Sequence, residues 1–216
     1  MTRRIVLLFI LVALVAAVAV TGFGGERANA VVEPAVAATT KLPDRVLGKA
    51  DAPVVVEEYV SLTCSHCAEF YNKTLPELEP KYVDTGKVKF ILRDFPLDGT
   101  ALKAAVLARC MPEDMFYPFV KTVYKNLKEW ATGENPEKTL IQYARLGGLS
   151  EDKAKACLAD KSLQDAVLAE RTTATEKMKI EATPTFIINY GAEKIEGGKT
   201  AAEFAAVLDR VLAKGK

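Results

Sequence analysis

The sequence predicts an α/β domain in which a small sheet is interrupted by a helical insertion. Apolar runs typical of strands occur at 53–60, 88–94 and 183–189, and the stretch between the last two repeats its apolar residues at helical spacing. Strands that are apolar throughout are typical of sheets buried on both faces. The order strand, helix, strand, helical block, strand, hairpin, helix therefore favours an α/β core with an insertion at about 98–180.

The first half of the core is expected to be strand, helix, strand. The strand at 53–60 leads into Cys-Ser-His-Cys at 64–67, which begins a helix that continues to about Lys73. A second, shorter helical stretch is expected within 74–85, and the next strand lies at 88–94.

The insertion is expected to be helical. Alanine and leucine dominate 101–110, and further helices are predicted at 140–146, 151–159 and 162–178. Apolar residues, many of them aromatic, recur three or four positions apart within 116–130 and mark one helical face. We expect this stripe to belong to the core; the alternative is that part of it lines a substrate groove.

The end of the chain returns to strands. An apolar run at 183–189 begins with Thr-Pro, a turn follows at 190–191, and a short partner strand is expected at 194–197. An amphipathic helix at 200–212 closes the domain.

Residues 1–30 are predicted to be a secretory signal peptide. A basic start is followed by an unbroken apolar run at 5–20 and by Ala28-Asn29-Ala30, the small-x-small pattern that precedes cleavage. Left uncleaved, the same run would anchor the protein in the membrane. Residues 31–46 lack periodicity and are expected to form a flexible leader before a domain at 47–216.

The composition excludes several partners. Without residues 1–30 the chain has 26 basic and 27 acidic residues, so the net charge is about −1 and no nucleic-acid or anionic-membrane partner is expected. We expect a monomer with no cofactor and no bound metal. Four cysteines in an exported chain fit an oxidising compartment.

The pair Cys64 and Cys67 carries the chemistry. Two thiols at this spacing can close into a reversible disulfide, and a helix start would stabilise the Cys64 thiolate through free N–H groups and the helix dipole. Cys67, one turn along, can then attack a mixed disulfide and resolve it. His66, the single histidine, can donate to the thiolate or add positive charge.

Three other interpretations of the pair remain open. A structural zinc site needs four ligands, and outside the motif the chain offers Cys110, Cys157 and no second histidine. A purely structural disulfide would close a very short loop and stabilise little. A Cu(I) site on Cys64 and Cys67, with or without His66, suits soft thiolate ligands.

These residues resemble the DsbA-type thiol-disulfide oxidoreductases of the thioredoxin fold. A strand leading into C-x-H-C, a long helical insertion and a later Thr-Pro-Thr-Phe strand carry the resemblance, which runs from about Leu47 to the C-terminus. It implies that Cys64 is the surface nucleophile, that Cys67 is the buried resolving thiol and that Pro184 is a cis-proline facing them.

The resemblance also implies a buried acid at Glu58, six residues before the nucleophile. An unpaired carboxylate in a buried strand is costly and should titrate high, as a proton carrier for Cys67 would. The alternative is a solvated charge at the sheet edge. Glu57 would point to the opposite face by strand alternation.

Two residues depart from the pattern of the strongest oxidases in that family. Ser65 stands where they have proline, and Thr183 stands before the cis-proline where they have valine. Thr183 also occurs in reducing and isomerising relatives, and a cis bond would turn its backbone toward the thiols, where an incoming peptide can pair with it as an extra strand. These departures leave the direction of electron flow open.

The resemblance extends to Cys110 and Cys157. Some relatives, among them oxidases of α-proteobacteria, carry an extra disulfide in the helical block, which implies one here. The alternative is two free core thiols. A bridge would stabilise the fold by roughly 4 kcal/mol in the chain-entropy model.

We therefore expect a periplasmic dithiol oxidase. Its substrates would be unfolded exported proteins with free thiols, and a DsbB-like, quinone-linked membrane partner would reoxidise it. A periplasmic reductase or isomerase, kept reduced by a membrane donor, is the alternative within the same class, and a Cu(I)-binding protein is the alternative from another class.

Overall fold

The computed structural model describes residues 41–215. The signal peptide predicted at 1–30, its cleavage site and the leader up to residue 40 lie outside the described residues. Within 41–215, no helix is both long and apolar enough to cross a membrane.

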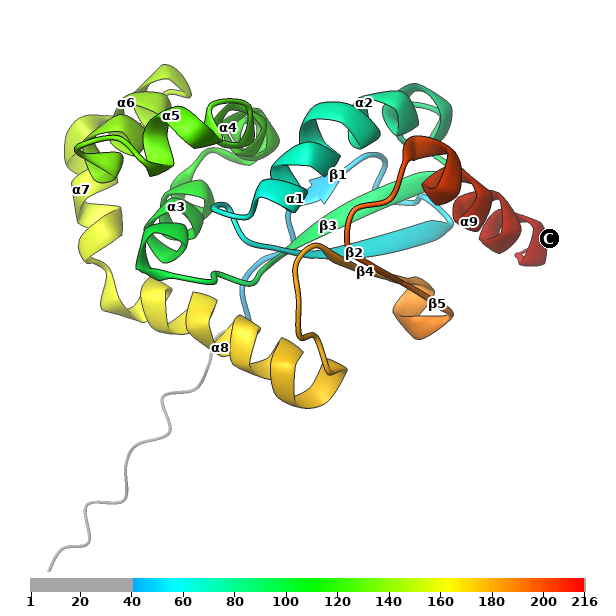
Figure 1. The fold of residues 1–216 in the computed structure, drawn as a ribbon. Coiled ribbons are helices and arrows are strands. Elements are labelled where there is room, and N and C mark those ends of the chain that lie inside the picture. The colour runs from blue at the N-terminus through cyan, green and yellow to red at the C-terminus, as the bar shows by residue number, and fades with distance from the viewer. Residues whose placement is uncertain (1–40, 216) are drawn as a thin grey trace, which may run out of the picture. The chain divides into compact units, whose positions relative to one another are not determined.

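A five-stranded sheet forms the centre of the domain (Figure 1), in the order β1-β3-β2-β4-β5. The central strands β2 and β3 are parallel, with Val54 opposite Val88 and Val60 opposite Asp94, and every other neighbouring pair is antiparallel. The bounds are β1 Val46–Leu47, β2 Val54–Val60, β3 Val88–Asp94, β4 Thr185–Ile188 and β5 Glu193–Glu196. The predicted strands are confirmed.

The helix after β2 differs from the prediction of two separate helices. The chain is helical from Ser65 to Val83 through α1 Ser65–Glu69, η1 Phe70–Thr74, α2 Leu75–Leu78 and η2 Glu79–Val83. Pro76 and Pro80 lack the N–H that an α-helix needs. Both η segments are π turns with hydrogen bonds five residues back, from Leu75 to Phe70 in η1 and from Asp84 to Glu79 in η2. These wider turns let one helix run through both prolines.

Six helices lie between β3 and β4, as the insertion requires. The aromatic stripe packs in the core: Trp130 and Tyr124 are among the largest fully buried side chains. The C-terminal helix starts with a capping box between Thr200 and Glu203. The bounds are α3 Gly99–Cys110, α4 Glu113–Lys125, α5 Leu127–Ala131, α6 Pro136–Leu146, α7 Glu151–Ala159, α8 Lys161–Met178 and α9 Ala201–Lys214.

Helices cover both faces of the sheet. Figure 1 shows α1, α2 and α9 on one face and α8 on the other. Because side chains alternate along a strand, Val56 and Glu58 of β2 point into the main core, whereas Tyr59 belongs to a smaller apolar cluster with Ala174 of α8. The motif-bearing helix α1 therefore lies on the face that Glu58 enters.

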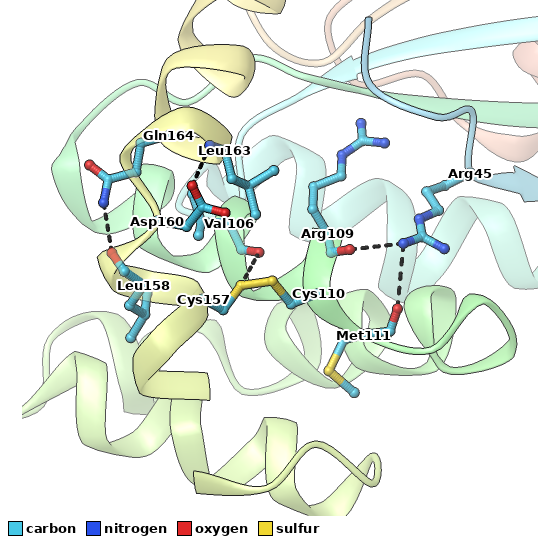
Figure 2. The surroundings of a disulfide bond; sticks show 10 residues. All are labelled: Arg45, Val106, Arg109, Cys110, Met111, Cys157, Leu158, Asp160, Leu163 and Gln164. Carbon is cyan, nitrogen blue, oxygen red and sulfur yellow. Dashed lines mark hydrogen bonds between the residues drawn. A yellow bond between two sulfur atoms is a disulfide. The ribbon is translucent and has the colours of Figure 1, made fainter. Parts of the chain in front are cut away.

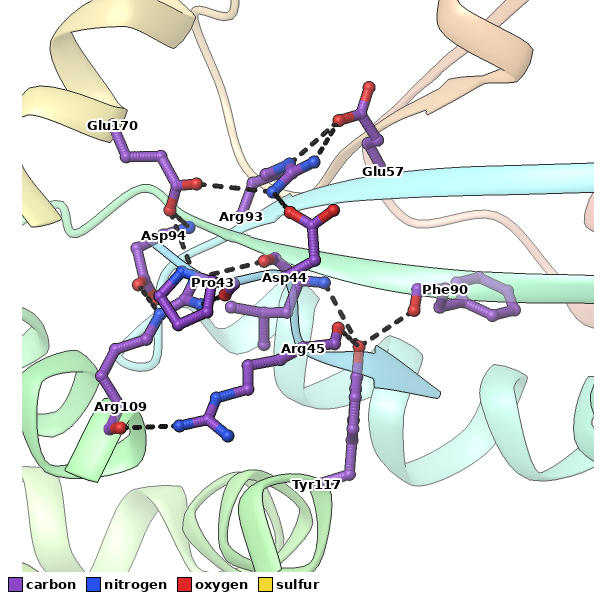
Figure 3. A network of polar contacts seen from close by, with 11 residues as sticks. Pro43, Asp44, Arg45, Glu57, Phe90, Arg93, Asp94, Arg109, Tyr117 and Glu170 are labelled. Carbon is purple, nitrogen blue, oxygen red and sulfur yellow. Dashed lines mark hydrogen bonds and ion pairs between the residues drawn. The ribbon is translucent and has the colours of Figure 1, made fainter. Parts of the chain in front are cut away.

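An ionic network fastens the start of the domain to the sheet and to the insertion (Figure 3). Arg93 of β3 donates to Asp44 at 2.6 Å, and Arg109 of α3 donates to Asp94 at 2.6 Å. Glu170 of α8 pairs with both arginines. The paired charges offset the cost of burying the arginines.

The predicted leader, 31–46, is wrong at its C-terminal end. Leu42 is buried, and Val46 pairs with Ile91 as part of β1. A two-residue edge strand and a single buried leucine leave no periodic signal, so the sequence alone placed the domain start several residues too late.

Candidate active site

Cys64 is the N-cap of α1, at the end of the loop that leaves β2. Its backbone is extended (φ −80°, ψ 122°), and its N–H donates to the carbonyl of Ser61 at 3.0 Å. Cys64 is half-buried and Cys67 fully buried, and both are free thiols in this structure. The predicted nucleophile is thus the accessible sulfur of the pair.

The two thiols have opposite electrostatics. The Cys67 thiol donates a hydrogen bond toward Cys64 and, against the effect of burial, lowers the Cys64 pKa to about 5; backbone N–H groups of α1 add to this. Burial raises the pKa of Cys67 well above its ordinary value, and its hydrogen bond to Cys64 raises it further. At neutral pH the pair therefore holds one thiolate, on Cys64, and one proton, on Cys67.

The loop before β4 faces the pair. The Thr183–Pro184 peptide bond is cis, and the Thr183 carbonyl oxygen lies 3.4 Å from Cys64 Sγ, where it can accept a hydrogen bond from the protonated thiol. The Thr183 hydroxyl is buried and has no hydrogen-bond partner among the described residues. The Thr183 carbonyl is therefore the group within hydrogen-bond geometry of the sulfur, and the nearby Thr183 side chain acts to lower the pKa of both Cys64 and Cys67.

Glu58 lies in the central strand β2 and is fully buried, which excludes the alternative of an edge charge. Tyr71 donates to Glu58 Oε1 at 2.5 Å, and Oε2 has no partner among the described residues. Burial raises the pKa of Glu58 to about 8, although the Tyr71 hydrogen bond acts to lower it. Glu57 points to the opposite face and pairs with Arg93 at 2.7 Å.

His66 is exposed at the first turn of α1. Its ring makes no hydrogen bond to either sulfur within the described part of the chain, whereas its backbone N–H is one of the groups that lower the Cys64 pKa. The effect of the His66 imidazole on the Cys64 thiolate, through its positive charge, thus remains a prediction.

Three polar residues near the pair were not predicted. Thr63 donates to Asp98 Oδ2 at 2.7 Å, and Asp98 Oδ1 accepts from the Ala101 N–H as the N-cap of α3. The Asp98 carboxylate therefore joins the residue before Cys64 to the start of the insertion. An aspartate before a helical run is a cap signal that the sequence offered, but its contact with Thr63 is tertiary.

The third is Tyr71, which lies four residues after Cys67. That spacing places both on one side of a helix, a signal that the sequence also offered.

The second cysteine pair forms a disulfide in the structure (Figure 2). Cys110 ends α3, Cys157 lies in α7, and their Cα atoms are 6.4 Å apart. The bridge connects two helices of the insertion. Among the described residues, no group of three or more His, Cys, Asp or Glu side chains is arranged to hold a metal ion.

Comparison with known proteins places this site in a family. A thioredoxin family model matches residues 40–210. The chain belongs to the thioredoxin family. Within that family it is DsbA-like: it superposes on the crystal structure of alpha-DsbA1 from Wolbachia pipientis with a TM-score of 0.73 at 35% identity, covering 81% of this chain and 94% of that one.

Two further proteins are similar to this thioredoxin-family chain. A Rickettsia bellii protein named as a protein-disulfide oxidoreductase is 34% identical over 147 residues, which are 68% of this chain and 57% of that protein. The chain thus spans little more than half the length of this relative. BdbD of Bacillus subtilis shares the fold, with a TM-score of 0.71 at 23% identity over 79% of this chain and 93% of that one.

Proposed function

We propose that this protein is an exported thiol:disulfide oxidoreductase that introduces disulfides into periplasmic proteins. The observation that carries the proposal is the difference between the two thiols: an accessible Cys64 with a pKa of about 5 and a buried Cys67 with a raised pKa. A stable thiolate is a good leaving group, so it favours giving the disulfide away.

The reaction begins with the Cys64–Cys67 disulfide. A substrate thiolate attacks Cys64 Sγ, a substrate–Cys64 disulfide forms, and the Cys64–Cys67 bond breaks with its electron pair going to Cys67. A second substrate thiolate attacks the first substrate sulfur and expels the Cys64 thiolate. The substrate is oxidised by two electrons, and the enzyme is left with one thiolate and one thiol.

Cys67 must take up a proton when the disulfide breaks, and we propose that Glu58 donates it. A buried thiolate released from the disulfide is costly, so protonation of Cys67 helps the first step forward. A carboxyl group with a pKa near 8 can give a proton at neutral pH and take it back when Cys67 must attack during reoxidation.

Substrate would meet the pair at the Thr183–Pro184 loop, where an extended peptide can pair with the Thr183 backbone. A groove of about 420 Å³ beside the motif, lined by residues that include His66, Phe70, Lys73 and Lys199, gives the peptide room. The substrates would be unfolded exported proteins with free thiols.

The surrounding machinery belongs to the same proposal. Its signal peptide would direct the protein to the periplasm, where it acts as a monomer, and a DsbB-like, quinone-linked membrane oxidase would restore the Cys64–Cys67 disulfide. Reduction or isomerisation is the competing direction, because Thr183 occurs in relatives of that kind.

Trapping tests the assignment of the two thiols. Cys67→Ala should accumulate mixed disulfides with thiol-containing exported proteins, because Cys64 can still attack or be attacked but nothing resolves the product. Cys64→Ala should accumulate none. Equal trapping by both variants would contradict the assigned roles, and tight Cu(I) binding without thiol oxidation would favour a copper-binding protein.

A further inference from the structure

Tyr71 enters the buried side of the site on the same helical run as the resolving thiol. It lies four residues after Cys67, which places both on one face, and they are 3% and 0% exposed. Tyr71 belongs to the π turn η1 Phe70–Thr74, which follows α1 directly. Such turns are frequent at functional sites.

The phenol of Tyr71 is held at both ends. Its hydroxyl donates to Glu58 Oε1 at 2.5 Å, and its ring packs on Tyr124 of α4 with the centroids 4.6 Å apart. Tyr124 is fixed in turn by donating to the Ser61 carbonyl at 3.1 Å. Burial, then the nearby Cys67 and Glu58, raise the pKa of Tyr124, so the acid and the resolving thiol both act on this phenol.

Among the described residues, no other side chain around Glu58 donates a hydrogen bond to its carboxyl group in place of the Tyr71 hydroxyl. Leu92 of β3 and Phe186 of β4 flank Glu58 in the sheet and are apolar. From α4, Tyr117 donates to the Arg45 and Phe90 carbonyls, and Lys121, the nearby cation, pairs with Glu79. Glu58 Oε2 is left as the buried oxygen without a partner.

We propose that Tyr71 is a positioning residue whose hydroxyl occupies Glu58 Oε1, so that Oε2 carries the proton exchanged with Cys67. The inference rests on the proposed function, because it assumes that Glu58 is the proton carrier. When the disulfide breaks, the proton leaves Oε2 for the Cys67 thiolate and Glu58 becomes a carboxylate. The Tyr71 hydrogen bond then becomes charge-assisted and stabilises that carboxylate.

The hydrogen bond should set the pH at which the acid works. A hydroxyl that donates to a carboxylate favours the ionised form, and the Tyr71 hydrogen bond acts to lower the Glu58 pKa against burial. Tyr71→Phe keeps the ring and removes the donor. The midpoint of any step that depends on Glu58 should therefore rise by about one pH unit, which is about a tenfold lower rate at neutral pH.

Oxidised glutathione separates the two half-steps. Reduced enzyme is mixed with it, quenched with acid at intervals and analysed by intact mass from about pH 5 to pH 10. Formation of the glutathione–Cys64 disulfide reports on Cys64, and its first-order resolution by Cys67 reports on Glu58 and Tyr71. We expect resolution to follow a midpoint near 8 in the wild type, a higher midpoint in Tyr71→Phe, and unchanged formation at Cys64.

Tyr82→Phe is the matched control, because Tyr82 is a buried phenol on the same helical run that donates to Asp209 at 2.8 Å. Its profile should equal that of the wild type. In a Glu58→Gln background the Tyr71→Phe change should no longer matter. An unchanged midpoint in Tyr71→Phe would overturn the inference while leaving the oxidoreductase intact.

Two further results keep the test decisive. A wild-type midpoint that survives Glu58→Gln would remove Glu58 from the proposed function and this inference with it, whereas absent formation at Cys64 would refute the oxidoreductase itself. If Tyr71→Phe does not fold, 3-fluorotyrosine at position 71 gives the opposite sign: a more acidic phenol donates more strongly and should lower the midpoint. An unchanged or higher midpoint with 3-fluorotyrosine would contradict the proposed role of the Tyr71 hydroxyl.

Discussion

Glu58→Gln should gain stability relative to the wild type as the pH rises to neutrality, because the fold keeps this buried acid protonated at a pH where the unfolded chain ionises it. The pKa of Glu58 is about 8 in the fold, against about 4.3 in an unfolded chain. Since the folded value is the higher one, the contribution of Glu58 to stability is full below about pH 4 and is lost as the pH rises toward 8. Linkage gives a loss of about 1 kcal/mol at pH 5 and about 3.5 kcal/mol at pH 7.

The difference between those two pH values is the quantity to measure, because the fixed cost of burying an amide in place of the acid cancels. Urea melts of reduced wild type and Glu58→Gln at pH 5 and pH 7 should show the stability difference moving by about 2.5 kcal/mol in favour of Gln. Glu57→Gln is the neighbouring control: it breaks the ion pair with Arg93 and should destabilise. A Glu58→Gln difference that does not change with pH would refute a buried acid with a raised pKa.

Three further predictions concern cysteines and the loop before them. Iodoacetamide should label Cys64 in the reduced protein at a rate that levels off above about pH 6, and a rate still rising at pH 8 would contradict a pKa of about 5. Replacing Cys110 and Cys157 by alanine should remove roughly 4 kcal/mol of stability, which lowers the melting temperature by about 10 °C, while thiol exchange stays measurable. An unchanged melting temperature would argue against a stabilising bridge. Asp98→Asn keeps the helix cap but removes a negative charge beside Thr63, the residue before Cys64. Because a nearby negative charge disfavours a thiolate, the Cys64 pKa measured by thiolate absorbance should fall. A rise in that pKa would exclude this electrostatic effect.

Much of the fold could be predicted because its signals are periodic. The strand at 88–94 is β3 to the residue, and the helix at 151–159 is α7, because uniform apolar runs and helical spacing survive in any context. β1 has two residues and is fixed by pairing with β3, which no local pattern reveals. The π turns on either side of Pro76 have no sequence signal, so the sequence predicted two separate helices where the structure has one continuous helical run.

The site was predicted unevenly for the same reason. Spacing brought out Cys64 and Cys67, and strand alternation correctly separated Glu58 from Glu57. The partner of Glu58 is Tyr71, and that contact depends on how the helix after the motif packs on β2. A single sequence does not reveal tertiary contacts of this kind. It does show that Cys67 and Tyr71 are four residues apart and therefore lie on one face of the helix.

The reduction potential of the Cys64–Cys67 pair tests the central claim most directly. Equilibration with glutathione buffers, followed by alkylation and mass analysis, gives the potential in a single titration. If the low Cys64 pKa stabilises the reduced form, the value should lie nearer to about −120 mV, typical of a strong DsbA oxidant, than to the about −270 mV of thioredoxin. A value at or below that of thioredoxin would contradict the proposed oxidase and assign the protein to the reductases.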